Sequence, residues 1–446
     1  MSDIIVPHNY QELGADFLLR SEGAILADQV GLGKTLTSLL AVIGSTARRI
    51  LIIVPLALKP WWVSEIVRVE RILADAVIFY ATDTEVSTGR RHYTLAHYEQ
   101  FRNGESSKLP GELTRQYLDK TWDIVILDEA HKIKGRDSQR TRWIKKLHTE
   151  QRWALSGTPM AEYPPDIWSL LNWADPQTFR YYWPFVNEYC ELDDNRRVIG
   201  IKHVLQNGRY TQAPTLEAFR ETLRPYILAR KLKDVGIELP PQTITDVPLK
   251  MADDQAAFYE EVATQVVIEL AEKSLPEYVL DFSRDNKLVI QNVGVRFTRL
   301  HQVASNPAHF KPGVSNIKLA WLDEYIEGGG EPSLVFTRYR GTVDVINRLL
   351  SLRNQRGWLV GTWDGLAEGL NLQRYAHTIT WDLPYPLLSW TQGLGRTHRM
   401  GQTRPTRVTR LLVQGSVDQR VAKKLDGKAN LTTMLMEWLR GLYDRR

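Results

Sequence analysis

Short runs of apolar residues recur through the first 160 residues, separated by longer stretches in which apolar residues return every three or four positions. The runs are rich in Val, Ile and Leu and are bounded by Gly, Pro or acidic residues, which is typical of buried strands in a parallel sheet. In chain order they read AILA, RILIIVP, AVIFYA, DIVILDEA and RWALSGTP. The stretches between them predict the crossover helices that parallel strands require. This part of the chain is expected to form an α/β unit.

The pattern then changes and later returns. Residues 163–230 are rich in aromatic residues and mostly helical in their periodicity, with a hairpin turn expected at Asn207-Gly208. A break at Pro240-Pro241 precedes the strand ITDVPLKM, and residues 254–304 again follow a helical period. Four further strands are predicted after residue 331: PSLVFT, WLVGT, HTITWDL and RVTRLLV. The chain is therefore expected to contain two α/β units that flank a helical middle.

Composition limits the classes of protein to which the chain can belong. Apolar residues make up 43% and charged residues 24%, which are ordinary values for a globular protein. The single cysteine, Cys190, excludes an internal disulfide and a zinc cluster built on several thiolates. The longest apolar stretch, residues 50–58, is too short to cross a bilayer, and the amino terminus lacks the pattern of a secretion signal. A soluble intracellular protein without membrane contact is expected.

Positive charge is slightly in excess, with a net charge of +5, and it is clustered. Seven basic residues and one acid lie between Lys132 and Lys146, and five arginines without an acid lie between Arg396 and Arg410. Such clusters fit a polyanionic partner, although a solvated helix face would look the same for the first of them.

The segment AILADQVGLGKT, residues 24–35, predicts a phosphate-binding loop between a strand and a helix. In such a loop, glycines such as Gly31 and Gly33 let backbone N–H groups face a phosphate at the positive end of the helix. Lys34 would reach the β- and γ-phosphates, and the Thr35 hydroxyl would coordinate Mg²⁺. The strict pattern begins with glycine, whereas this chain has Asp28 there.

A second motif, WDIVILDEAH, ends an apolar strand in two carboxylates. Asp128 can hold Mg²⁺ through water, and Glu129 can orient and deprotonate an attacking water. An acidic helix cap would explain one carboxylate but not the combination with Lys34, 94 residues earlier. The two motifs together predict a hydrolase that uses a nucleotide and Mg²⁺.

The order of these motifs resembles SNF2-family ATPases of helicase superfamily 2, from about Tyr10 to about Leu425. NYQ resembles the family's glutamine motif, which implies that Gln11 reads the adenine edge. Residues 223–241 and 247–262 resemble the segment that joins the SNF2 helical insert to the second motor lobe, a segment that general DEAD/DEAH helicases lack. The resemblance implies two RecA-like lobes, each a parallel sheet with flanking helices, plus helical inserts.

Other motifs imply contacts to a nucleic-acid strand. LIIVPLAL and TLAHYEQF resemble motifs that touch DNA, which makes Pro55 and Tyr98 candidate contacts. ALSGTPM resembles the motif that couples nucleotide state to strand binding, through Ser156 and Thr158. Lys134, in the basic run, is a further candidate.

The last two motifs are GLAEGLNLQ and QGLGRTHRMGQ. The first implies nucleotide contacts from Gly369 and Asn371. In the second, Gln392, Arg396 and Arg399 are spaced by four and three residues, which predicts that they line one face of a helix. Arginines that face a nucleotide can act as fingers that stabilise the transferring phosphoryl group.

The chain departs from the family pattern at several points. Leu366-Ala367 replaces the usual Gly-Gly pair, and only 28 residues separate Phe336 from Gly365, so the second lobe is expected to be shortened. No accessory domain is recognisable, and such a motor-only chain suits a compact viral or mobile-element genome.

Five segments are expected from these motifs. Lobe 1 with the ATP-binding motifs spans 1–162, and its helical insert and the linker span 163–240. The start of lobe 2 with a helical insert spans 241–315, lobe 2 with the arginine fingers spans 316–428, and a C-terminal helix or tail spans 429–446. The expected function is a DNA-dependent ATPase, a monomer that moves along or remodels double-stranded DNA without sequence preference. Two alternatives stay open: an ATP-regulated nucleic-acid-binding switch without processive movement, and an RNA-dependent DEAH-type ATPase.

Overall fold

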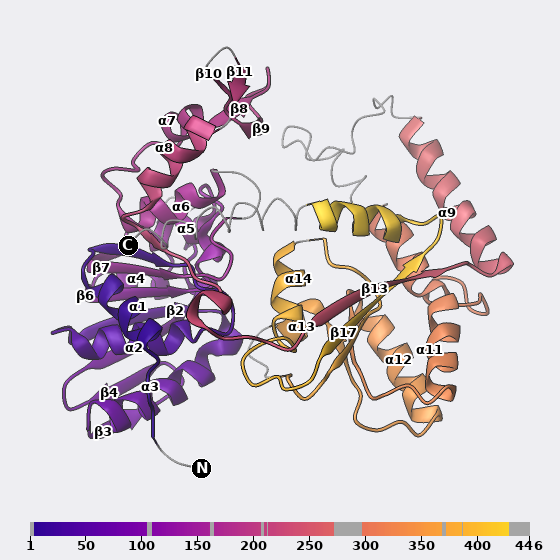
Figure 1. Ribbon diagram of the computed structural model, residues 1–446, viewed down its shortest axis with the longest axis horizontal. Helices are drawn as coiled ribbons and strands as arrows, with labels where there is room; N and C mark the ends of the chain where they lie inside the picture. Colours follow the sequence, from indigo (N-terminus) through magenta and orange to yellow (C-terminus); the bar gives the residue numbers. More distant parts are fainter. Residues whose placement is uncertain are drawn as a thin grey trace. The chain divides into compact units, whose positions relative to one another are not determined.

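The computed structural model describes residues 4–104, 109–160, 165–206, 209–211, 213–271, 297–367, 372–385 and 387–427. Residues up to Glu238 form one compact unit, and residues from Leu239 form a second (Figure 1). Each unit is built on its own sheet with helices on both faces. The predicted α/β class with two parallel sheets is confirmed.

The first unit contains an eight-stranded sheet in the order β12-β1-β7-β6-β2-β5-β4-β3, of which the six strands from β12 to β5 run parallel. The strands are β1 (Gly23–Leu26), β2 (Arg49–Val54), β3 (Ile78–Ala81), β4 (Glu85–Thr88), β5 (His92–His97), β6 (Thr121–Asp128), β7 (His148–Leu155) and β12 (Ile227–Leu228). Four of the five predicted apolar runs are central strands of this sheet. The strand β5, which also lies centrally beside β2, was not among the predicted runs.

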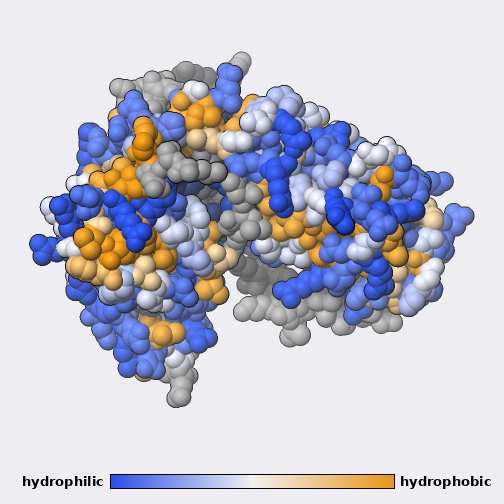
Figure 2. Space-filling view, turned by 90° about the horizontal axis from the view of Figure 1, so that it is seen from below, coloured by the Kyte–Doolittle hydropathy of each residue, from blue (hydrophilic) through white to orange (hydrophobic). Residues whose placement is uncertain are grey.

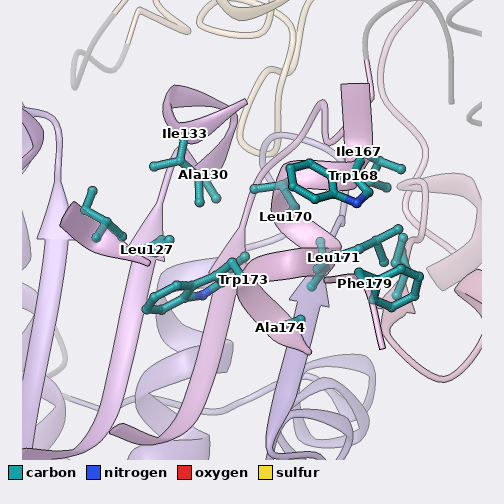
Figure 3. Close-up of a cluster of buried hydrophobic side chains, with 14 of the residues drawn as sticks. Leu127, Ala130, Ile133, Ile167, Trp168, Leu170, Leu171, Trp173, Ala174 and Phe179 are labelled. Atoms are coloured by element: carbon teal, nitrogen blue, oxygen red, sulfur yellow. The ribbon is translucent and has the colours of Figure 1, made fainter. Parts of the chain in front are cut away.

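Both faces of this sheet are buried, because successive residues of its strands enter different core clusters. Leu51 and Ile53 of β2 pack in one cluster, whereas Ile50 and Ile52 pack in the other. Figure 3 shows part of the first cluster, where the sheet meets α6 and the turn after β6. The covering helices are α1 (Asn9–Leu19), α2 (Lys34–Gly44), α3 (Lys59–Leu73), α4 (Glu112–Leu118), α5 (Gln139–Ile144) and α6 (Pro165–Ala174).

The predicted strand AVIFYA is the exception. It forms β3, which pairs antiparallel with β4 at the edge of the sheet, so the prediction of a buried parallel strand is wrong. Val77 and Phe79 expose about two thirds of their surface (67% and 68%). Figure 2 shows one face of the molecule, on which hydrophobic residues gather in separate patches among hydrophilic ones. The apolar run predicted a strand, but its edge position depends on pairing with β4, which the run does not encode.

Between α6 and β12 the chain forms the insert. It contains two helices and two small antiparallel hairpins: α7 (Tyr182–Tyr189), α8 (Ala213–Leu223), β8 (Cys190–Leu192), β9 (Val198–Ile201), β10 (Val204–Gln206) and β11 (Arg209–Thr211). The strands β10 and β11 pair across the predicted Asn207-Gly208 turn, whose own residues lie outside the described ranges.

The second unit contains a five-stranded, wholly parallel sheet in the order β13-β17-β16-β14-β15. Its strands are β13 (Gln242–Leu249), β14 (Leu334–Thr337), β15 (Leu359–Thr362), β16 (His377–Thr380) and β17 (Thr406–Val413), and all five were predicted. Its helices are α9 (Asp253–Ala271), α11 (Ile317–Glu327), α12 (Arg340–Leu352), α13 (Trp363–Ala367), α14 (Leu387–Leu394) and the helical residues 297–305 and 417–427. None of the helices in the described ranges is long and apolar enough to cross a membrane.

A buried ionic cluster joins the elements of the second unit. The Lys318 Nζ atom of α11 lies 2.8 Å from Asp418 and 3.3 Å from Asp382, and all three side chains are buried. His301 Nε2 lies 3.3 Å from the other Asp418 oxygen. Buried charges are tolerated only when they are paired, so this cluster fixes α11 and the residues after β16 and β17 against one another.

Candidate active site

Three of the predicted motifs meet at one edge of the first sheet. The strand β7 lies between β1 and β6, with Leu155 in register with both Leu26 and Asp128. All three strands are parallel, so the segments that follow them leave from the same edge. These segments are the phosphate loop after β1, the Ser156–Thr158 segment after β7, and the carboxylate pair at the end of β6. Ligands of open α/β sheets bind at this edge.

The phosphate loop has the backbone conformation that its glycines predict. Gly31 has φ 101° and Gly33 φ 74°, values that L-residues with side chains rarely adopt. Gly33 immediately precedes α2, so the first N–H groups of this helix have no partners within the helix. Lys34 Nζ donates to the backbone carbonyl of Asp28 at 2.8 Å. The lysine is thus held across the loop by a backbone carbonyl of the same loop.

Gln11 lies against this loop. Its Nε2 donates to Leu32 O at 3.3 Å, and its Oε1 accepts from His8 N at 3.0 Å. A Cβ atom added at Gly33 would lie 2.6 Å from the Gln11 Nε2. The start of α1 is therefore packed directly on the phosphate loop.

Asp128, the first carboxylate after β6, is buried and hydrogen-bonded at both oxygens. Its Oδ2 accepts from Trp62 Nε1 at 2.8 Å, and its Oδ1 accepts from Glu129 N at 2.9 Å. Burial, followed by the negative charge of Glu129, raises the pKa of Asp128 to about 6. The Trp62 bond and the positive charge of Lys34 act in the opposite direction and lower this pKa.

Glu129 has the left-handed backbone conformation (φ 50°, ψ 49°), which is uncommon for a residue other than glycine. Its side chain is one fifth exposed, and its Oε2 lies 3.3 Å from His131 Nδ1. Unusual backbone conformations of this kind concentrate at functional sites. The glutamate is partly accessible, beside a buried aspartate, as a water-activating base would need to be.

The Ser156–Thr158 segment lies beside the phosphate loop. Ser156 N donates to Leu26 O at 3.1 Å, and Ser156 Oγ accepts from Thr158 N at 3.2 Å. A Cβ atom at Gly157 would lie 3.6 Å from Lys34 Nζ and 2.8 Å from a Val30 methyl group. The segment therefore touches the loop that is predicted to bind phosphate.

The chemistry of the available donors fits Mg²⁺. Thr35 offers a hydroxyl at the start of α2 and Asp128 a carboxylate at the same edge of the sheet. Within the described ranges, no group of three His, Cys, Asp or Glu side chains could form an all-protein metal site. Mg²⁺ is usually held by one or two protein oxygens together with waters and substrate phosphates, so these residues suffice.

The predicted arginine pair lies in the second unit, but not on a helix as expected. The helix α14 ends at Leu394, and the chain continues as turns, with Arg396 N donating to Gly393 O. The prediction of one helical face shared by Gln392, Arg396 and Arg399 is therefore wrong. Glycines at 393 and 395 weaken the helix at this point, because glycine loses more backbone entropy than other residues.

Arg396 and Arg399 nevertheless lie close to each other. Burial and then the charge of Arg396 lower the pKa of Arg399. The Nε atom of Arg399 is buried and has no hydrogen-bond partner among the described residues. Two like charges near each other, one with an unsatisfied donor, form a site that favours an anion.

The turn that holds this pair is fixed from both sides. Gln402 Nε2 donates to Gln373 O at 2.8 Å and to Thr397 O at 3.1 Å. His398 Nε2 lies 2.7 Å from Pro240 O, which precedes β13. His398 and Gln402 of the HRMGQ segment thus fix the turn that carries the two arginines.

The candidate DNA contacts divide into two groups. Pro55, Tyr98 and Ser156 are buried, and the Tyr98 hydroxyl donates to Asp128 O at 2.6 Å. These three side chains have little surface to offer a DNA strand, so contact by them stays a prediction that their burial does not favour. Lys134 is exposed and Thr158 partly exposed, and both could reach a strand. Gly369 and Asn371 lie outside the described residues.

Three residues of this site were not predicted from the sequence. Trp62 and His131 each contact one of the two carboxylates, and Arg230 binds Asp28. His131 lies in the WDIVILDEAH motif and Arg230 in the segment 223–241, which were the available signals, whereas Trp62 follows the LIIVPLAL motif by four residues. Neither signal identifies the partner, which for Arg230 is 202 positions away.

Comparisons with known proteins agree on one family. The SNF2-related domain matches residues 10–292, which is more than half of the chain. Protein CHROMATIN REMODELING 4 of Arabidopsis thaliana is 24% identical and covers 94% of this chain. The Putative ATP-dependent helicase/translocase YwqA of Bacillus subtilis is 23% identical and covers 96% of this chain.

The chain spans 20% of the length of the plant relative and 48% of the bacterial one. Among solved structures, the Sulfolobus solfataricus SWI2/SNF2 ATPase core in complex with dsDNA is 19% identical, with a TM-score of 0.42 over 97% of this chain and 93% of that one.

Proposed function

The chain belongs to the SNF2-related domain family, and we propose that it hydrolyses ATP in order to move along, or remodel, double-stranded DNA without sequence preference. The observation that supports this most directly is the meeting of a phosphate loop, a coupling segment and a carboxylate pair at one edge of the first sheet. Chromatin remodelling and helicase/translocase names among the relatives support the choice of DNA.

In this proposal the first unit binds the nucleotide. The N–H groups at Gly31, Gly33 and the start of α2 bind the phosphates, and Gln11 binds the adenine edge. Lys34 exchanges its bond to the Asp28 carbonyl for the β- and γ-phosphates, which costs little because one acceptor replaces another.

Glu129 orients the attacking water and accepts its proton. His131 is its neighbour, with Nδ1 3.3 Å from the Glu129 Oε2. Asp128 and the Thr35 hydroxyl would hold Mg²⁺, through water in the case of the carboxylate. When bound, the metal supplies charge neutralisation at the phosphates. The bond from Trp62 keeps the Asp128 carboxylate oriented and favours its ionised form.

The second unit is proposed to supply the arginine fingers. Arg396 and Arg399 would stabilise negative charge on the transferring phosphoryl group, as arginine fingers do. Gln392 remains a candidate for the same site, and Gly369 and Asn371 remain predicted nucleotide contacts. For the DNA strand, Lys134 and Thr158 are the proposed contacts. One chain supplies every proposed group, so a monomer suffices, and its substrates place its action inside a cell.

The test compares phosphate release by the purified protein with duplex DNA, single-stranded DNA and RNA, using Lys34→Ala as the inactive control. Duplex DNA of unrelated sequences should stimulate the rate equally. The stimulation should fade with salt, because the logarithm of the apparent binding constant for DNA falls against the logarithm of the salt concentration with a slope of about −0.9 per phosphate contact. Stronger stimulation by RNA would favour the DEAH-type alternative. Displacement of a third strand from a triplex then separates movement from an ATP-regulated switch, which would hydrolyse ATP without displacing the strand.

A further inference from the structure

Asp28 places a carboxylate at the first position of the phosphate loop. It stands where a strict phosphate loop begins with glycine, and its side chain is fully buried (0% exposed). A carboxylate at a loop that binds a triphosphate opposes binding, because like charges repel more strongly where water is excluded. The loop therefore needs a device that offsets this charge.

Arg230 provides a matching positive charge. Its Nε donates to Asp28 Oδ1 at 2.9 Å and one of its terminal nitrogens to Asp28 Oδ2 at 2.5 Å, a bidentate pair in which both side chains are at most 1% exposed. Its other terminal nitrogen donates to Tyr10 O at 2.5 Å, next to the proposed adenine-binding Gln11. Bidentate arginine–carboxylate pairs fix geometry as well as charge.

The guanidinium group has almost no freedom to move. A Cβ atom added at Gly14 of α1 would lie 2.8 Å from an Arg230 nitrogen and 2.7 Å from the Thr37 methyl group of α2. The arginine thus fills the contact between the helix that contains Gln11 and the helix that follows the phosphate loop. Its position is set by packing from both helices.

The backbone around Arg230 is also tied to the loop. Gln29 N donates to Arg230 O at 2.9 Å, and Leu232 N donates to Gln29 Oε1 at 3.3 Å. Eight residues later, Glu238 ends the first unit. The segment that leaves the first unit is therefore bonded to the phosphate loop by both its side chain and its backbone.

We propose that Arg230 is a positioning residue for ATP: it neutralises Asp28 and holds the start of the phosphate loop against α1, so that the loop offers the triphosphate N–H groups without an uncompensated negative charge. The inference rests on the proposed ATPase function. It adds that ATP binding by the phosphate loop also requires Arg230, a residue about 200 positions later in the chain than the loop.

The test measures the Kd for Mg-ATP by calorimetry in the absence of DNA, and the KM and kcat with DNA. Arg230→Ala should raise Kd and KM about tenfold or more, because a buried carboxylate is left without its partner beside the anion. At saturating ATP, kcat should change much less, because Glu129 is untouched. The neutral pair Asp28→Asn with Arg230→Gln should bring Kd back to within about threefold of the wild type. Failure of this pair to recover ATP binding, or a wild-type Kd in Arg230→Ala, would overturn the proposal.

Arg91 offers a matched control, because it forms another buried pair with Glu70 at 3.3 Å, on α3 and away from the phosphate loop. Arg91→Ala should lower the Tm of the protein, because Glu70 loses its charged partner and keeps only the hydrogen bond from the Tyr93 hydroxyl, but should leave the Kd for ATP unchanged. An equal loss of ATP affinity in Arg91→Ala would show that any buried defect has this effect, and the proposal would fall.

Asp28→Asn alone keeps the test decisive if Arg230→Ala does not fold. This variant removes the negative charge while it retains an oxygen acceptor for the arginine, so ATP should bind as tightly as in the wild type or more tightly. Weaker binding would contradict the proposed role of Arg230 as an electrostatic partner. Absence of ATP binding by the wild type would instead refute the proposed function itself, whereas wild-type binding with a failed rescue refutes this inference alone.

Discussion

The substitution Trp62→Phe tests whether a single hydrogen bond sets the ionisation of the proposed metal-binding carboxylate. Trp62 is fully buried, and its Nε1 donates to Asp128 Oδ2 at 2.8 Å. Burial and the neighbouring Glu129 raise the pKa of Asp128 to about 6, and the Trp62 bond is among the effects that keep it from rising further. Phenylalanine preserves most of the ring but removes the donor.

The size of the effect follows from the value of such a bond. A hydrogen bond to a charged group contributes about 1.5 kcal/mol or more, which corresponds to about one pKa unit. The pKa of Asp128 should therefore rise from about 6 to about 7. At pH 6 the ionised fraction would fall from about one half to about one tenth, whereas at pH 8.5 the two proteins would differ little.

The assay measures kcat/KM for Mg-ATP between pH 5.5 and 9 with saturating duplex DNA, since the pH dependence of kcat/KM reports groups of the free enzyme. The acidic limb of the profile should move to higher pH by about one unit in Trp62→Phe. Trp153→Phe is the matched control. Trp153 is as buried as Trp62 and lies in β7, the strand beside β6, but its Nε1 has no hydrogen-bond partner among the described residues. A profile that is lowered at all pH values without a shift, or an equal shift in Trp153→Phe, would refute the reasoning.

Three further predictions concern other parts of the molecule. Glu129→Gln should retain Mg-ATP binding but lose hydrolysis, because the water loses its base; calorimetry and phosphate release check this, and loss of binding would show a structural role. Arg396→Ala or Arg399→Ala should leave the Kd for ATP nearly unchanged and lower DNA-stimulated kcat by a factor of about 10³ or more. Lysine at either position should restore little of the rate, because it lacks the planar guanidinium fork. If both alanine variants keep more than about a third of the wild-type kcat, the two residues are not arginine fingers. Asp418→Asn should lower the free energy of unfolding at neutral pH but much less at pH 2. Burial alone would raise the pKa of Asp418, but the nearby lysine and histidine outweigh it and lower the pKa to about 2. The ionised form is therefore favoured by folding, and a stabilisation of about 2 kcal/mol is present above pH 4 and lost as the pH falls towards 2. Urea unfolding of wild type and variant at pH 7 and pH 2 measures this, and a difference that persists at pH 2 would contradict it.

Local patterns were enough to predict the five strands of the second sheet and four central strands of the first, β1, β2, β6 and β7. A strand such as β6 is buried on both faces, so its apolar run is visible without knowledge of its neighbours. The same holds for Gly31 and Gly33, because a positive φ is a local demand that glycine meets most easily. The motifs at the ends of β1, β6 and β7 could be placed together because the carboxyl ends of parallel strands share one edge.

Predictions that depended on neighbours in space were less successful. The run that forms β3 has the composition of a buried strand, yet its pairing with β4 places it at the exposed edge. Tyr98 lies in a motif that resembles a DNA-contacting one, but its ring is buried and its hydroxyl binds Asp128 O. The spacing of Arg396 and Arg399 fits a helix, whereas the chain leaves the helix at Leu394. Spacing along the chain does not reveal which residues from other elements will pack against a side chain or hydrogen-bond to it.

The sequence by itself thus determined the α/β class, the two sheets and the residues that are proposed to bind and hydrolyse a nucleotide, because each of these depends on patterns within a few consecutive residues. Only the tertiary structure decided how those residues are held. Trp62 is 66 positions from Asp128, and Arg230 is 202 positions from Asp28. Such partners are chosen by burial, since a carboxylate removed from water must find a donor wherever the fold brings one, and no local pattern records where that donor lies.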